Sequence, residues 1–204
     1  TMPADYDIIL RNGTLYDGSG GPGVPGDLAI DGQTIAALGN LADDNGRREL
    51  DLGGLAVAPG FINMLSWSTE SLIVDGRSQS DIRQGVTLEV MGEGFSFGPL
   101  SESMKAVQLA EQGDIKYEIK WNTLSEYLRY LEQRGISCNV ASFVGATTIR
   151  DFVIGLEDKQ PTPEPLEQMR QLVRKEMEAG AHGLGPSLTY PPALYSNTGG
   201  LFTL

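Results

Sequence analysis

Beyond about Leu55, short apolar runs alternate with segments of helical spacing, and this alternation limits the possible fold more than any other feature. The apolar runs are Leu55–Met64, Val86–Met91 and Ile136–Val144, and a fourth begins at His182. Strands that alternate with helices form βα units and a parallel sheet. Because strands of a parallel sheet are covered on both faces, we expect the Leu55–Met64 run to be buried.

Two of the intervening helices have clear boundaries. Residues 123–135 open with a Thr-x-x-Glu capping box, in which each side chain satisfies a backbone N–H, and close with glycine. Residues 162–180 open with threonine as the N-cap and Pro163 in the first turn. Shorter helices are expected over residues 78–84 and 103–112. Helices therefore separate the strand-like runs, as βα units require.

The residues before this region predict only short strands and tight turns. Asp31-Gly32 lies between two apolar runs, which is a strong hairpin signal. We therefore expect a small all-β, sandwich-like domain over residues 1–58 and an α/β domain over residues 59–204. Four strand–helix units fit into the second domain, whereas a complete (β/α)8 barrel takes roughly 250 residues. The domain is either a small open α/β sheet or the first half of a TIM-like barrel.

The charge balance excludes several classes of partner. The chain carries 15 basic and 27 acidic residues, for a net charge of -12, and no Lys/Arg cluster appears. We therefore expect no binding to nucleic acid or to an anionic membrane surface. No apolar run reaches the roughly 18 residues of a spanning helix. The first residues lack the pattern of a secretion signal, so the expected compartment is the cytoplasm, although a signal removed upstream is left open.

Cysteine and histidine each occur once, as Cys138 and His182. A disulfide framework within the chain, a Ser-His-Asp triad and a cluster of histidine metal ligands are thus excluded. Cys138 lies early in a strand, where a buried, unreactive thiol is expected. His182 also begins a strand. That position belongs to the amino-terminal face of a barrel, so we interpret it as structural.

Several motifs, in order along the whole chain, resemble one known group of proteins. The chain is similar to the N-acyl-D-amino-acid deacylase (D-aminoacylase) branch of the amidohydrolase superfamily, and to the amino-terminal portion of its members. The motifs that carry the resemblance are Tyr6–Thr14, Asp27–Ile30, Thr34–Gly39, Leu55–Asn63, Gln84–Thr87, Ala179–Leu184 and Tyr190–Pro192.

The resemblance implies a β-sandwich-like domain beside a TIM-like barrel, of which this chain holds the first part only. It also implies metal-assisted hydrolysis of an amide bond, in which a metal-bound water attacks the carbonyl group. The family's catalytic carboxylate and its remaining histidine ligands belong to later strands. The resemblance therefore implies no catalytic residue within this chain. We expect the active site to need further polypeptide, which is either supplied as a second subunit in an oligomer or lost by cleavage.

The sequence departs from the family at two metal-binding motifs. Where the superfamily usually has Asp-x-His-x-His, this chain has Leu65 and Trp67 at the two histidine positions. Neither side chain can donate a lone pair to a metal ion. Where the branch has Gly-Asn-Cys-Gly, with cysteine as a ligand, this chain has Gly-Glu-Gly centred on Glu93. The resemblance implies Glu93 as the metal ligand of this chain and a single divalent ion, most simply zinc. Without the resemblance, Glu93 would be interpreted as a surface turn residue.

Candidate substrate contacts follow the expected strand ends. Ser66 and Trp67 lie at or beside the vacated ligand positions, and Tyr190 matches a tyrosine of the family's substrate pocket. The alternatives are a polar loop with one aromatic residue buried for packing, and a tyrosine stacked on the following two prolines. Arg77 is expected to pair with Asp75 or Asp81 at the surface.

Three classes of function stay open. The first hypothesis is that the chain is part of an enzyme that hydrolyses an N-acyl-D-amino acid or a related peptide-like substrate. The second is that it is a non-catalytic amidohydrolase-like structural or assembly subunit. Loss of both histidines motivates the second class. A ligand-binding module that uses the pocket at the strand ends without chemistry is a weaker third hypothesis.

Overall fold

The computed structural model of the chain describes residues 5–197 and divides between Gly60 and Phe61 into two compact units. The division lies two residues after the domain boundary that the sequence predicts. The strands are β1 (Asp5–Leu15), β2 (Val24–Asp31), β3 (Thr34–Gly39), β4 (Asn45–Asp51), β5 (Ala56–Val57), β6 (Phe61–Asn63), β7 (Val86–Met91), β8 (Asn139–Ser142), β9 (Val144–Gly145) and β10 (Leu184–Gly185). The helices are α1 (Ser71–Val74), α2 (Gln79–Ile82), α3 (Glu102–Glu111), α4 (Leu124–Arg134), α5 (Ala146–Ile154), α6 (Pro163–Glu178) and the 3₁₀ turn η1 (Ala193–Tyr195).

The first unit is a mixed β-sheet in the order β3-β2-β1-β4, with β5 also paired to β1. β2 pairs antiparallel with both β1 and β3, whereas β4 and β5 run parallel to β1. The predicted hairpin is confirmed, with Asp31 paired to Thr34 across the turn. Asn12 lies within β1, where its φ of 55° accompanies a shift in register, so Asn12-Gly13 forms a bulge.

One row of side chains across this sheet is apolar from edge to edge. Leu38, Leu28, Leu10 and Leu50 are directly opposite one another across β3, β2, β1 and β4. The two outer members of this row, Leu38 and Leu50, are 60% and 39% exposed. The all-β character of the unit is as predicted. Within the described residues it consists of one sheet, so the second layer of a sandwich stays a prediction.

The second unit contains parallel strands in simple chain order. β6, β7 and β8 pair in sequence, and β9 pairs with β10. Only Phe143 separates β8 from β9, and its N–H donates to the carbonyl of Met91 at 2.8 Å. β8, β9 and β10 are joined further by hydrogen bonds from His182 N to Ser142 O and from Val144 N to Gly183 O. The backbone thus forms one continuous run of four parallel strand positions, whose sequential order favours the barrel over a doubly wound open sheet.

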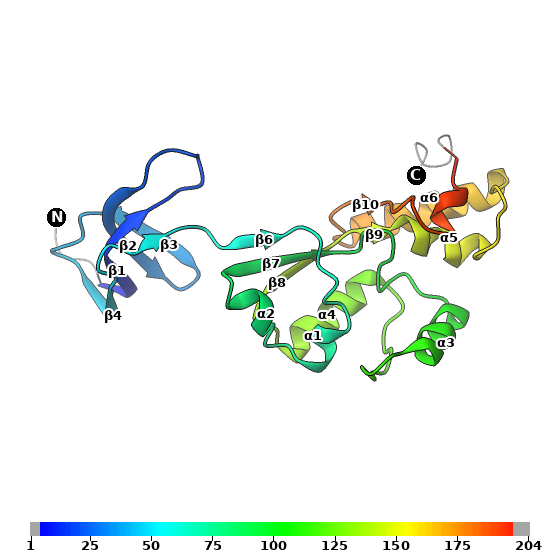
Figure 1. The fold of residues 1–204 in the computed structure, drawn as a ribbon, viewed down its shortest axis with the longest axis horizontal. Coiled ribbons are helices and arrows are strands. Elements are labelled where there is room, and N and C mark those ends of the chain that lie inside the picture. Colours follow the sequence, from blue (N-terminus) through cyan, green and yellow to red (C-terminus); the bar gives the residue numbers. More distant parts are fainter. Residues whose placement is uncertain (1–4, 198–204) are drawn as a thin grey trace. The chain divides into compact units, whose positions relative to one another are not determined.

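Helices cover one side of this sheet (Figure 1). α1 and α4 pack against β7 through a core that includes Leu72, Met91 and Leu131, each no more than 2% exposed. Trp121, Tyr127 and Phe97 form an aromatic cluster within the same core, with ring centroids 5.1–6.1 Å apart. The four helices expected from the sequence are confirmed as α2, α3, α4 and α6, and the capping box of Thr123 and Glu126 opens α4.

The structure differs from the sequence analysis in two respects. The Leu55–Met64 run is not buried: Leu55, Phe61 and Met64 are 67%, 63% and 57% exposed. For Phe61 and Met64 the reason is that β6 is the edge strand of the described sheet, so no further strand among residues 5–197 lies beside them. α5 was also missed, because its sequence is rich in β-branched residues that have low helix propensity.

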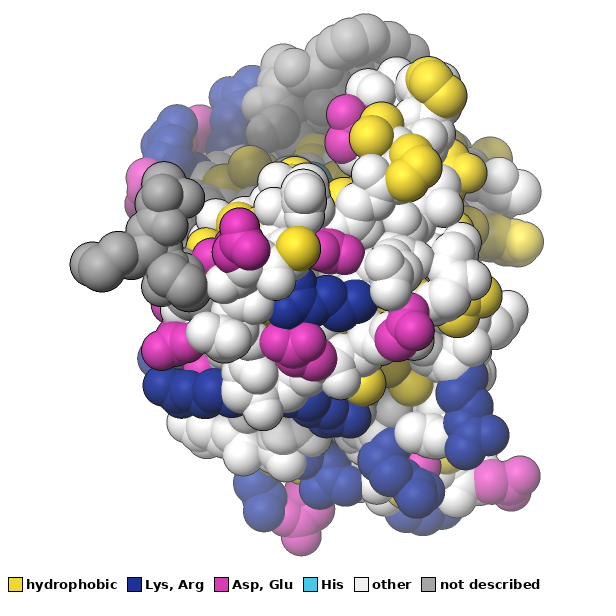
Figure 2. Space-filling view, turned by 90° about the vertical axis from the view of Figure 1, so that its left-hand side faces the viewer, with side chains coloured by type: hydrophobic (Ala, Val, Ile, Leu, Met, Phe, Trp, Pro, Cys, Tyr) yellow, Lys and Arg dark blue, Asp and Glu magenta, His cyan; other side chains and the backbone are white. Residues whose placement is uncertain are grey.

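On the face shown in Figure 2, lysine and arginine side chains are interspersed with acidic ones. Among the described residues no helix has the length and apolar character needed to cross a bilayer.

Candidate active site at the strand ends

Glu93 lies in a tight loop directly after β7, where the carboxyl ends of several strands meet. The neighbouring Gly94 donates its N–H to the carbonyl of Gly185, the last residue of β10, at 3.0 Å. Its own carbonyl accepts from the N–H of Thr147 in the first turn of α5, also at 3.0 Å. The loop is therefore fixed by β10 and α5. The Glu93 side chain is exposed and has no partner among residues 5–197.

The glycines on either side of Glu93 are required by packing. Gly92 and Gly94 have φ values of 89° and 75°, a region that favours glycine. A Cβ atom on Gly92 would overlap the carbonyl oxygen of Phe143, and one on Gly94 would overlap the side chain of Ser187. The two glycines therefore let the loop lie against β8, β9 and the segment after β10.

The described residues do not form a metal site by themselves. No group of three or more His, Cys, Asp or Glu side chains within residues 5–197 is arranged to hold an ion. Leu65 and Trp67, at the positions where the resemblance implies histidines, are 53% and 65% exposed and offer no donor. Glu93 could contribute one carboxylate, so further ligands would have to come from outside the described residues.

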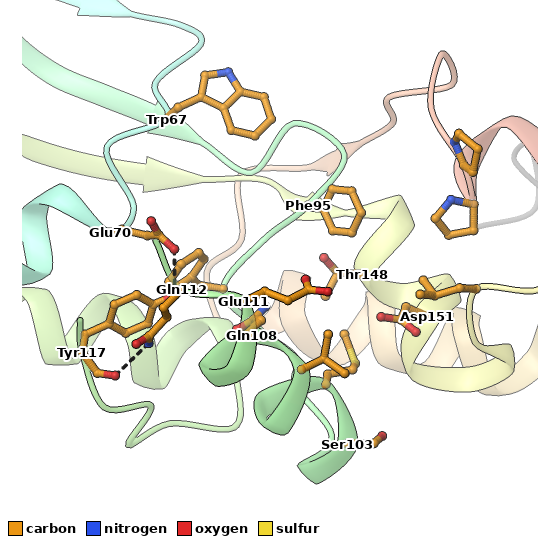
Figure 3. Close-up of a pocket in the computed structure, with 16 residues that line it drawn as sticks. Trp67, Glu70, Phe95, Ser103, Gln108, Glu111, Gln112, Tyr117, Thr148 and Asp151 are labelled. Carbon is orange, nitrogen blue, oxygen red and sulfur yellow. Dashed lines mark hydrogen bonds between the residues drawn. The ribbon is translucent and has the colours of Figure 1, made fainter. Parts of the chain in front are cut away.

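A cavity of about 660 Å³ opens near this loop, a volume typical of small-molecule sites. Phe95, two residues after Glu93, lines the cavity, whereas Glu93 itself does not. Its walls come from the segments that follow β6, β7, β9 and β10, so it lies at the carboxyl ends of the strands. Figure 3 shows Trp67 and Glu70 on one side of the cavity and Asp151 on the other. Its apolar lining consists of Trp67, Phe95, Phe97, Met104, Val107, Leu156, Pro191 and Pro192.

Three carboxylates also line this cavity, and no lysine or arginine does. Glu70 accepts a hydrogen bond from the hydroxyl of Tyr117 at 2.9 Å, and burial together with this carboxylate raises the pKa of Tyr117. Burial also raises the pKa of Asp151, whose carboxylate has no partner within the described part of the chain. A partly buried carboxylate with a raised pKa in a cavity is a candidate functional group. Glu111 of α3 is the third.

Ser66 is placed differently from the predicted substrate contact. It is 5% exposed, and its hydroxyl donates to Oε2 of Glu89 at 2.6 Å. Ser78 donates to Oε1 of the same carboxylate, which is fully buried in the middle of β7. Ser66 therefore anchors the loop after β6, and its hydroxyl is not available in this arrangement to a ligand in the cavity. This arrangement does not support the assignment of Ser66 as a substrate contact.

The other candidate residues are located as follows. Trp67 lines the cavity, and Tyr190 is 67% exposed beside the two prolines that also line it. His182 is exposed, and its ring lies edge-on to Phe143 with centroids 5.6 Å apart. Cys138 is buried as predicted, and burial raises the pKa of its thiol. Arg77 pairs with Asp75 at 2.7 Å, which confirms the predicted surface ion pair.

Sequence reasoning missed Glu89, Asp151 and Glu70. Glu89 alternates with apolar residues along a strand, so the pattern alone would place it on a solvated face. Asp151 lies on α5, the helix that the sequence did not reveal. Glu70 was visible only as one of a run of polar residues after β6, and its pairing with Tyr117 depends on a segment 47 residues away.

No family model matches the chain. Individual proteins, however, match most of its length. The D-aminoacylase of Alcaligenes xylosoxydans xylosoxydans is 34% identical over 197 residues, which are 95% of this chain and 40% of that protein. The crystal structure of a D-aminoacylase superposes with a TM-score of 0.85 at 30% identity, over 97% of this chain and 42% of the other.

The chain is related to the N-acyl-D-amino-acid deacylases. A third match agrees: the N-acyl-D-glutamate deacylase of Bordetella bronchiseptica, whose structure contains zinc and a phosphonate inhibitor, gives a TM-score of 0.84 at 26% identity. It covers 98% of this chain and 42% of that one. The chain thus spans about two fifths of the length of the deacylases it matches, and it corresponds to their amino-terminal portion.

Proposed function

We propose that this chain supplies the first half of the barrel of a metal-dependent amidohydrolase. The enzyme would hydrolyse the amide bond of an N-acyl-D-amino acid or a related peptide-like substrate. The observation that carries the proposal is the meeting of the Glu93 loop with the ends of β9 and β10. It puts a free carboxylate where parallel barrels gather functional groups, beside a cavity of suitable size.

In this proposal Glu93 binds one divalent ion, with zinc as the expected metal. A bound divalent ion would supply polarisation of the amide carbonyl and activation of water. The remaining ligands would come from polypeptide beyond the described residues. Trp67 and Tyr190 contact the substrate, Trp67 as an apolar wall of the cavity and Tyr190 at its rim.

The partner in this proposal is the polypeptide that completes the barrel, in the cytoplasm. Phe61, Ile62 and Leu65 on and just after β6 are 63%, 55% and 53% exposed, which is unusual for a strand of a parallel sheet. Strand pairing at this edge would cover these side chains and remove an aggregation-prone edge. The same exposure supports a barrel that continues past β6.

A non-catalytic amidohydrolase-like subunit is the second candidate. The observation that favours it is the presence of Leu65 and Trp67 where the resemblance implies metal-binding histidines. Such a subunit would use the open edge of β6 for assembly and would need no metal ion.

Metal content and turnover separate the two candidates. The chain is purified together with the polypeptide that completes the barrel, without added metal, and analysed for zinc and other transition metals. It is then assayed against N-acyl-D-amino acids with apolar, acidic and basic side chains. We expect about one equivalent of metal and hydrolysis of at least one substrate. Well under one equivalent, with no turnover after zinc is added, would favour the assembly subunit.

A further inference from the structure

The buried carboxylate of Glu89 has a position that neither the fold nor the proposed reaction explains. Its side chain is 0% exposed, at the centre of β7 and on the side of the sheet that faces the helices. None of the ion pairs within residues 5–197 includes it. An ionisable group in such a place is costly unless its hydrogen bonds are satisfied. It accepts hydrogen bonds from the hydroxyls of Ser66 and Ser78.

These two serines lie 12 positions apart in the connection from β6 to β7. Ser66 lies just after β6, and Ser78 is the N-cap residue of α2, the last helix before β7. Ser78 has a φ of 44°, an uncommon conformation for a residue with a side chain. One carboxylate therefore clamps two points of this crossover, one near its start and one at the beginning of its last helix.

The Ser66 arm of this clamp determines the conformation of the next residues. The Ser66 hydroxyl gives its hydrogen to Glu89 and accepts a hydrogen bond from the N–H of Ser68 at 3.2 Å. The backbone N–H of Ser66 donates to Val90 O at 2.8 Å, which continues the β6–β7 pairing. Ser68 O in turn accepts from Leu72 N in α1 at 3.0 Å. Trp67 lies between the two tied serines.

The second half of this turn, Thr69 and Glu70, is fixed by hydrogen bonds to other residues. Thr69 O accepts from the hydroxyl of Tyr127 at 2.9 Å, and Glu70 accepts from Tyr117. Trp67 and Glu70 both line the cavity, so the turn forms one of its walls (Figure 3). Glu89 lies behind this wall and does not line the cavity itself.

We propose that Glu89 is a positioning residue that acts through Ser66 to hold Trp67 on the cavity wall. The Ser78 arm of the same carboxylate fixes the start of α2 and has no such effect on Trp67. The inference concerns the geometry of the wall and does not depend on the reaction proposed above.

The test uses ¹⁹F NMR of protein labelled with 5-fluorotryptophan, including any polypeptide that completes the barrel. Trp67→Phe assigns the Trp67 resonance by its disappearance. Trp121, 1% exposed in the core, reports whether each variant is folded. Ser66→Ala and Ser78→Ala form a matched pair, because each removes one hydroxyl from the same carboxylate and leaves the other in place.

We expect Ser66→Ala to shift or split the Trp67 resonance while the Trp121 resonance stays in place. We expect Ser78→Ala to leave the Trp67 resonance unchanged. Glu89→Leu should disturb Trp67 at least as strongly as Ser66→Ala. Glu89→Gln should restore most of the native signal, because its carbonyl oxygen can still accept from Ser66.

Three results would overturn the inference. The first is a native Trp67 resonance in Ser66→Ala. The second is an equal change in Ser66→Ala and Ser78→Ala, which would mean that the clamp is merely structural. The third is a Glu89→Gln variant as disturbed as Glu89→Leu. If Glu89→Leu fails to fold, the serine pair and Glu89→Gln still decide the question.

Discussion

The middle of β7 and its carboxyl end present the same side chain in opposite settings. Glu89 is fully buried and accepts hydrogen bonds from two serine hydroxyls. Glu93, four residues later, is exposed and has no partner within the described part of the chain. A carboxylate whose hydrogen bonds are already satisfied stabilises the structure around it. A free carboxylate held on a rigid loop is available to a ligand. The comparison distinguishes a carboxylate that stabilises the structure around the site from one that is available to bind a ligand in the site.

The contrast is sharpest when each glutamate is truncated. Glu89→Ala leaves two buried hydroxyls without an acceptor and opens a cavity, so we expect a loss of about 3 kcal/mol or more in the free energy of unfolding. Glu93→Ala should change it by less than about 0.5 kcal/mol, as is usual at exposed positions. Urea-induced unfolding of both variants measures the difference. Equal losses of unfolding free energy in the two variants would contradict the distinction between Glu89 and Glu93.

The loop that carries Glu93 depends on its glycines. Gly92→Ala combines a φ of 89° with overlap against Phe143, and we expect it to cost about 2–4 kcal/mol. Gly155→Ala is the matched control, because Gly155 has a φ of 76° but open space around its Cβ position. It should cost about 1–2 kcal/mol from backbone strain alone. The same unfolding measurement applies, and a Gly92→Ala variant no less stable than Gly155→Ala would contradict the packing argument.

Metal binding should respond to Glu93 and not to other exposed carboxylates. We expect Glu93→Ala to weaken binding by at least about 10–100-fold, the range found when only a residue that supports a ligand is removed. Glu178→Ala removes an equally exposed charge from α6 and should have no such effect. Competition with a chelating dye measures the affinity of each variant in the protein with its completed barrel. Equal affinities would show that Glu93 is not a ligand.

A third carboxylate, Glu176, tests how burial is reflected in pH dependence. It is 1% exposed on α6 and accepts from the N–H of Leu124, at the start of α4, at 3.1 Å. Burial raises its pKa above the ordinary value of 4.5. The folded state then holds a proton that the unfolded state releases, so this contribution to stability is present below 4.5 and is lost as the pH rises through the folded pKa.

We therefore expect the free energy of unfolding of the native chain to fall, relative to Glu176→Gln, as the pH is raised from 4.5 toward neutrality. Unfolding curves at several pH values for both proteins provide the measurement. Parallel pH dependences would mean that Glu176 titrates normally despite its burial.

The smallest effect is expected at the exposed ion pair of Arg77 and Asp75. The Arg77 guanidinium, with help from the Arg77 N–H, lowers the pKa of Asp75 to about 2. Its contribution to stability is present above 3.8 and is lost as the pH falls through about 2. Arg77→Ala should raise the pKa of Asp75 only part of the way to 3.8, because the backbone N–H remains. NMR titration measures this, and stability near neutral pH should hardly change.

The sequence predicts those parts of the fold that depend on local signals. Helices α4 and α6 were located by their N-caps, and the hairpin by Asp31-Gly32. The α5 helix was missed because packing between β9 and α6 overrides its low intrinsic propensity. The Leu55–Met64 run was predicted to be buried, since its composition does not reveal that β6 lies at an edge.

The candidate site was predictable only where a motif carries it. Glu93, Trp67 and Tyr190 followed from the resemblance, and the structure places them at the strand ends. Ser66 was assigned from its place in the same motif, but its direction is set by Glu89, a residue 23 positions away. Contacts at such sequence separations have no local pattern, so the clamp of Glu89, Ser66 and Ser78 could not be inferred before the structure.

The most direct test of the account is the structure of the zinc-loaded protein with its completed barrel, with zinc located by its anomalous scattering. The account predicts one ion at the carboxyl ends of the strands, with a Glu93 carboxylate oxygen at roughly 2.0–2.2 Å from it. An ion bound without Glu93, or a fully closed barrel with Glu93 directed into solvent and no ion nearby, would contradict it.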